Sequence, residues 1–184
     1  MHVYGLEAVY DHAIRLPAQM ELRPGLSYTW TGSRFRTSFS GAGYFGSVKE
    51  GDRLPYVPEH QGSARVLWVH PVGDVELSVS AQGPMRDVPG QGEVAALEKI
   101  PAHAVVDLAA TLRVTRHASV YLKINNLTDA RYMVSRRPLG VRPGRPFHLM
   151  VGLKLAFAPR GPGVIEKLRD GKLRPPAVPP RPID

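Results

Sequence analysis

Residues 120–157 decide the fold, and they read VYLKINNLTDARYMVSRRPLGVRPGRPFHLMVGLKLAF. Towards the end of this stretch every second residue is apolar: Phe147, Leu149, Val151, Leu153, Leu155 and Phe157. The residues between them are mixed and include His148 and Lys154. A period of two places alternate side chains on opposite faces of a sheet. The stretch therefore predicts a strand with one uncharged face, which meets either a dry core or lipid.

The same alternation recurs along the whole chain. It predicts further strands at 3–14, 19–33, 62–69, 75–82, 106–114 and 120–125. Within the second of these, Pro24 and Gly25 indicate a bulge or an edge position, because proline cannot donate to a neighbouring strand. The full-length runs come close to what a tilted strand needs to cross a bilayer. The fold class predicted is all-β, with about seven antiparallel up-and-down strands.

The lengths of the connections choose between a dry core and lipid. Short connections at 15–18, 70–74 and 115–118 alternate with long ones that begin at residues 34, 83 and 126. Outer-membrane barrels have short turns at one end and long loops at the other, so this parity predicts a transmembrane β-barrel segment. The polar residues of the second face then line a wet lumen, namely Glu76, Asp107, Lys123 and Lys154. Tyr10, Tyr28 and Trp30 are expected near strand ends, in an aromatic girdle.

Composition narrows the function classes. The 184 residues carry a formal net charge of +8, which suits nucleic acid, an acidic membrane surface or an anionic ligand. No helix-turn-helix, zinc-finger or RNA-binding motif appears, so nucleic acid is not an expected partner. The chain has no Cys, which excludes disulfides and thiolate metal sites. Its first residues lack a signal peptide pattern, and no apolar run is long enough for a transmembrane helix.

No catalytic or metal-binding constellation emerges from the sequence. The seven His are scattered and form no H-x-x-x-H or H-E-x-x-H motif, which makes a metal site unexpected. Ser135 lacks the context of a nucleophile elbow. The glycine-rich pieces at 41–46 and 89–92 do not join a strand to a helix, so they are not phosphate-binding loops. We expect neither an enzyme nor a bound cofactor.

Residues 125–132, N-N-L-T-D-A-R-Y, resemble the N-N-L-x-D-x-x-Y signature near the end of TonB-dependent outer-membrane receptors. The closing L-M-V-G-L-K-L-A-F is similar to that family's last strand. G-D-R-L-P-Y-V-P-E-H at 51–60 and M-R-D-V-P-G-Q-G at 85–92 resemble segments of the branch related to ferric dicitrate receptors. The signature residues are expected to have structural roles: to end a strand, to cap a turn and to anchor the loop with an aromatic ring. They are Asn125, Asn126, Leu127, Asp129, Tyr132 and Phe157.

The resemblance implies a 22-stranded barrel of the cell outer membrane that holds a plug domain and imports ferric chelates, such as siderophores or ferric citrate. Outer-membrane lipid, the chelate and the TonB complex would be its partners. Residues 1–157 would correspond to the C-terminal part of the barrel, with the plug and the TonB-contacting part missing. Residues 158–184, rich in Pro and Arg, are expected to be a disordered tail. The alternative is a small autonomous β-barrel, either in the outer membrane or as a soluble binding protein.

Four arginines of the last long loop are the candidate ligand-binding residues: Arg136, Arg137, Arg142 and Arg145. In a complete receptor they would attract an anionic chelate, because guanidinium groups pair with carboxylates through two hydrogen bonds. The competing interpretation is a solvated loop, or contacts with anionic lipopolysaccharide. We expect these arginines on the extracellular side of the barrel.

Overall fold

A computed structural model describes residues 1–41, 45–137 and 139–157. These residues form strands, turns and loops, and no helix among them is long and apolar enough to span a membrane. The expected tail at 158–184 lies outside the described residues.

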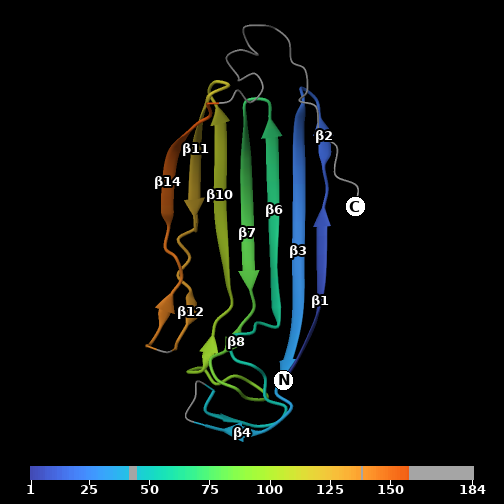
Figure 1. The fold of residues 1–184 in the computed structure, drawn as a ribbon, viewed down its shortest axis with the longest axis vertical. Helices are drawn as coiled ribbons and strands as arrows, with labels where there is room; N and C mark the ends of the chain where they lie inside the picture. The colour runs from blue at the N-terminus through green and yellow to red at the C-terminus, as the bar shows by residue number, and fades with distance from the viewer. Residues whose placement is uncertain (42–44, 138, 158–184) are drawn as a thin grey trace.

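One antiparallel sheet dominates the molecule (Figure 1). Its strands are β1 (His2–Asp11), β2 (Ile14–Leu16), β3 (Met20–Arg34), β6 (His60–His70), β7 (Gly73–Gln82), β10 (His103–Arg113), β11 (Ala118–Asn125) and β14 (His148–Leu155). The strand order is β1-β3-β6-β7-β10-β11-β14, with β2 also paired to β3. Neighbours in the sheet are therefore neighbours in the sequence, which is the predicted up-and-down topology. In the described part of the chain, β1 and β14 are the two edges of the sheet.

β1 and β2 are two pieces of one strand. Asp11 pairs with Gly25 and Ile14 pairs with Leu22, so the register does not shift between them. The break falls opposite Pro24, whose carbonyl accepts the His12 N–H at 3.1 Å. Proline has no N–H to return that bond, which interrupts the ladder. The predicted bulge or edge position is wrong: β3 has partners on both sides, with no register shift.

The register sorts the side chains into two faces. Cross-strand neighbours Leu6–Trp30, Val66–Leu77 and Leu122–Val151 all belong to one face, which is apolar across the whole sheet and largely exposed. Apolar side chains on a sheet face that nothing covers are costly in water. The face therefore requires an apolar environment, as the alternation predicts.

The opposite face is polar. Glu76, Asp107, Lys123 and Lys154 share it through the registers of β7, β10, β11 and β14. An exposed ion pair joins Arg65 and Asp11 at 2.6 Å across it, and a partly buried one joins Arg113 and Asp74. A neutral hollow of about 330 Å³ lies nearer the long loops and is lined by Ser27, Thr29, Gln61, Ser80, Gln82 and His103.

Short and long connections lie at opposite ends of the sheet (Figure 1). Three-, two- and four-residue turns join β2 to β3, β6 to β7 and β10 to β11. The three long loops gather at the other end, and each contains a small hairpin that the sequence does not predict. These hairpins are β4 (Phe39–Ser40) with β5 (Ser47–Val48), β8 (Met85–Arg86) with β9 (Lys99–Ile100), and β12 (Met133–Ser135) with β13 (Arg142–Pro143).

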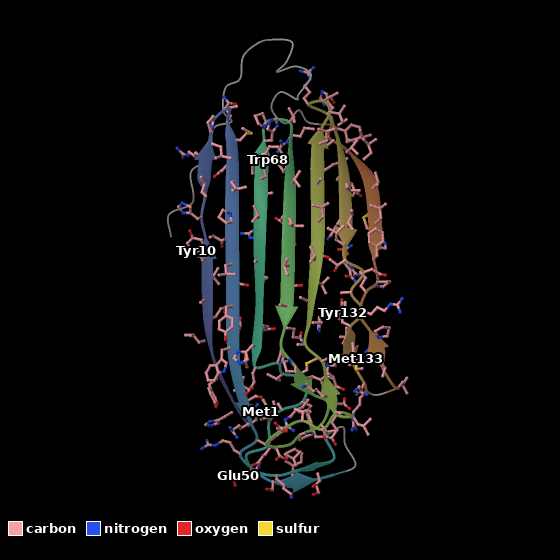
Figure 2. All side chains as sticks on the ribbon, turned by 180° about the vertical axis from the view of Figure 1, so that it is seen from behind. Met1, Tyr10, Glu50, Trp68, Tyr132 and Met133 are labelled. Carbon is pink, nitrogen blue, oxygen red and sulfur yellow. The ribbon has the colours of Figure 1, made fainter. Side chains whose placement is uncertain are left out.

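The expected aromatic girdle is only partly formed. Trp30 pairs with His60, the first residue of β6, and its ring meets Tyr4 edge-on with centroids 5.6 Å apart. Tyr10, however, pairs with Leu26 in the middle of β3, and lies halfway along the sheet (Figure 2). The prediction that Tyr10 lies at a strand end is wrong, because β2 continues its strand. Trp68 instead is the aromatic residue close to the short turns (Figure 2).

Candidate ligand-facing loop cluster

The three long loops, residues 35–59, 83–102 and 126–147, form what we call the loop cluster. Among the described residues, the buried apolar side chains all belong to it: Phe35, Val48, Met85 and Ile100. The faces of the sheet supply none, because each strand has solvent or lipid on both sides. The first two loops therefore share a small core of their own at the end of the sheet (Figure 1).

Asp87 connects all three loops. Its carboxylate accepts a hydrogen bond from the Tyr56 hydroxyl and one from Arg137 Nε at 3.1 Å. The Tyr56 oxygen in turn accepts the Arg137 backbone N–H at 3.3 Å. The side chain of Asp87 is only 8% exposed, whereas that of Arg137 is 45% exposed. The buried carboxylate is thus paired with a guanidinium that reaches solvent.

A second set of bonds fastens the first loop to the second. Arg53 N–H donates to Gly90 O at 2.9 Å, and Tyr56 N–H donates to Arg86 O at 2.9 Å. Gln91 Nε2 donates to the carbonyl of Glu50 at 3.0 Å and to Asp52 Oδ1 at 3.2 Å. Two backbone bonds and two bonds of one side chain thus join these loops at several points.

Two arginines lie inside the cluster with spare donors. Arg86 is buried, and its Nη2 donates to Gly92 O; Arg136 Nη2 donates to Lys99 O at 3.3 Å. The Nε atoms of both side chains are buried and have no hydrogen-bond partner among the described residues. Such donors need a water or a ligand oxygen.

The four candidate arginines are not one cluster. Arg136 and Arg137 point their side chains into the contacts with the second loop, so Arg137 is neutralised by Asp87. Arg142, in β13, and Arg145 are exposed. No described residue forms an ion pair with either side chain. Of the four candidate arginines, Arg142 and Arg145 are therefore the two whose guanidinium groups are available to an anion.

The residues of the N-N-L-T-D-A-R-Y motif fold the start of the last loop. Asn126, which is 1% exposed, has a φ of 52°, a value that Asn tolerates better than most residues. Its side chain accepts Ala130 N–H at 2.8 Å and donates to the carbonyls of Ala130 and Arg145 at 2.9 Å each. Its own N–H donates to Asp107 Oδ1 at 2.8 Å. Asn126 is thus the main capping residue.

Two more motif residues hold the rest of the loop. Asp129 Oδ1 accepts Phe147 N–H at 3.0 Å, just before β14. Tyr132 stacks on His103, the first residue of β10, with ring centroids 4.3 Å apart. Asn125 ends β11 opposite His148, and Leu127 N–H donates to Val106 O at 2.7 Å. Phe157 is almost fully exposed, beyond the end of β14.

A family model described as TonB dependent receptor-like, beta-barrel, matches residues 1–127. The chain belongs to the TonB-dependent receptor β-barrel family. This match spans β1 to β11 and all three short turns, so it covers most of the sheet described above. Family members are β-barrels of the outer membrane, and the sheet is accordingly a piece of barrel wall with its apolar face towards lipid. In such barrels the long loops are extracellular and the short turns periplasmic.

Individual relatives agree with this assignment. The metal-pseudopaline receptor CntO of Pseudomonas aeruginosa is 31% identical over 118 residues, which are 60% of this chain and 16% of that protein. The siderophore receptor PiuA from Acinetobacter baumannii has a similar fold, with a TM-score of 0.61 at 19% identity over 83% of this chain and 21% of its own. The ferric-catecholate import receptor Fiu from E. coli K12 matches at 0.51, with 15% identity over 83% of this chain and 27% of Fiu. The chain thus spans about a sixth of the curated relative. These relatives are transport receptors and not enzymes.

Reasoning from the sequence missed the partners of Arg137. Tyr56 and Asp87 lie in the segments D-R-L-P-Y and M-R-D, which stand out as family-like. Nothing local in them shows that they meet, because Tyr56 and Asp87 are 31 residues apart and Asp87 and Arg137 are 50 apart. The long loops before the arginine-rich one contain acidic residues. Their presence could have indicated that some of the four arginines are paired rather than free.

Proposed function

We propose that this chain forms part of the wall and of the ligand-facing loops of a TonB-dependent receptor that imports a metal chelate. CntO, PiuA and Fiu are receptors for metal-pseudopaline, siderophore and ferric-catecholate import, respectively. Their shared cargo is a chelated metal or its carrier. The chain contributes no chemical step to import, because its part is to supply shape, charge and an extracellular surface.

The observation that carries the proposal is the joined loop cluster with two exposed guanidinium groups. Rigid loops hold their binding groups without a large ordering cost when a ligand arrives. Asp87 fixes Arg137, which lies in the connection from β12 to β13, and Arg142 is the first residue of β13. Arg142 and Arg145 are thus placed on a supported loop at the extracellular end.

An anionic chelate is the ligand class that this loop favours. Guanidinium groups pair with carboxylates by two parallel hydrogen bonds, and each charge-assisted bond contributes about 1.5–3 kcal/mol. Ferric citrate, a carboxylate chelate, is therefore the first ligand to test. TonB would act through another part of the receptor, while the polar face of this sheet would line the lumen.

The test is ferric citrate binding by the intact receptor in detergent. Replacing Arg142 and Arg145 together by Gln is expected to raise the dissociation constant about tenfold or more, since two charge-assisted contacts are lost. Arg15→Gln with Arg116→Gln removes the same charge at the short-turn end and is the matched control. Arg137→Ala is unsuitable, because it would leave Asp87 buried and unpaired.

The control distinguishes a direct contact between the loop and the chelate from attraction by the net charge of the protein. If both double variants weaken binding equally, net charge and not the loop attracts the chelate. If neither changes the dissociation constant, the loop does not contact ferric citrate and the proposed ligand class is wrong.

A further inference from the structure

The lipid-facing side of the sheet is not smooth. Near the short turns it contains a groove of about 350 Å³ that crosses β6, β7, β10 and β11. Its lining is apolar and includes Trp68, Val75, Ala110, Leu112, Val120 and Leu122. That volume is within the range of sites that hold small molecules.

Small residues create the groove. The register places Gly73 between His70 and Leu112, and Ala110 between Val75 and Leu122. Gly73 lies so close to β10 that a Cβ atom there would come within 2.2 Å of the Thr111 carbonyl oxygen. Gly73 and Ala110 form the floor of the groove, and the larger side chains of Trp68 and Val120 form its two walls. Because the groove belongs to the lipid-facing surface, whatever fills it comes from the bilayer.

Polar groups stand at the periplasmic end of the groove. His70 Nδ1 accepts the Val72 N–H at 3.2 Å, which leaves the ring proton on Nε2 as a hydrogen-bond donor. Arg116 and His117 lie in the turn that joins Leu112 to its cross-strand partner Val120. An apolar channel that ends at donors and a cation matches an acyl chain attached to an anionic phosphate group.

We propose that the groove binds one acyl chain of a phospholipid from the periplasmic leaflet, with His70 and the 115–117 turn facing its head group. Trp68, whose ring centroid is 5.3 Å from that of His70, forms the wall at the level of the interface, where tryptophan is favoured. The site is distinct from the chelate-binding loops, because it lies at the opposite end of the strands (Figure 2).

The experiment is native mass spectrometry of the intact receptor, delipidated in detergent and titrated with phosphatidylethanolamine. The parent protein is expected to hold one lipid at concentrations where further adducts are rare. Ala110→Phe fills the floor of the groove and is expected to raise the dissociation constant of this lipid about tenfold, which corresponds to about 1.4 kcal/mol. Ala104→Phe adds the same side chain to the same face of β10, outside the groove, and is expected to leave binding unchanged.

A second variant guards against misfolding. Trp68→Ala removes one wall without adding bulk and is expected to weaken the same adduct, while heat-modifiable migration of each variant in gel electrophoresis reports an intact barrel. Equal lipid binding by the parent, Ala110→Phe and Trp68→Ala would overturn the proposal, as would the absence of any discrete adduct on the parent.

Discussion

At the scale of single residues, Asp87 has the largest expected influence on the loop cluster. Its carboxylate contacts both Tyr56 and Arg137, and its side chain is buried. Removing one partner from a buried charged network leaves the others without their hydrogen bonds. The effect should be local, because the sheet itself does not depend on this contact.

Asp87→Ala is therefore expected to free the loops while the barrel stays folded. The loss of about 1–3 kcal/mol of local stability should raise the rate at which trypsin cuts the loop cluster about tenfold, since cleavage follows the open population. Asp74→Ala removes the acid of a partly buried ion pair with Arg113 at the opposite end and serves as the control. Equal cleavage of the parent, Asp87→Ala and Asp74→Ala would show that Asp87 does not hold the loops together.

At the scale of strands, β11 and β14 show how an aromatic residue covers a glycine across a sheet. Tyr121 pairs with Gly152 on the polar face, and a Cβ atom on Gly152 would fall 2.2–2.5 Å from atoms of the Tyr121 side chain. The aromatic ring thus occupies the space that a side chain at position 152 would need.

Gly152→Val separates packing from strand propensity. Valine is the better strand former, so propensity alone would stabilise the protein. Overpacking against Tyr121 is expected to outweigh this and to destabilise it by about 1–3 kcal/mol. The measurement is the urea midpoint of the receptor folded in vesicles, with Met150→Leu on the same strand and face as a volume-conserving control. A midpoint that rises in Gly152→Val would contradict the packing account.

The strands also show where sequence reasoning succeeds and where it stops. Alternation predicts the faces of β7, β10, β11 and β14 correctly, because a two-residue period is a local property. The alternation of short and long connections predicts that the short turns gather at one end of the strands and the long loops at the other. The loop hairpins and the role of Pro24 could not be predicted in the same way, since they depend on which distant segment lies opposite. For the same reason the four arginines look alike in sequence, although Asp87 pairs with only one of them.

At the scale of the whole molecule, the central claim is that one face of the sheet meets lipid and the other meets water. Leu77 and Ser78 are consecutive residues of β7, so they lie on opposite faces, and the chain has no Cys of its own. Once any Cys elsewhere in the receptor is replaced by Ser, each position can carry a spin label on a single introduced cysteine in the receptor embedded in vesicles. This pair compares the two faces at the same depth in the bilayer.

Electron paramagnetic resonance with oxygen and a water-soluble nickel chelate as relaxing agents measures the environment of each label. We expect the label at Leu77→Cys to relax mainly through oxygen, which concentrates in the bilayer, and the label at Ser78→Cys to respond more to the nickel chelate. Equal exposure of both labels to the nickel chelate, or the reverse pattern, would contradict the assignment of the apolar face to lipid.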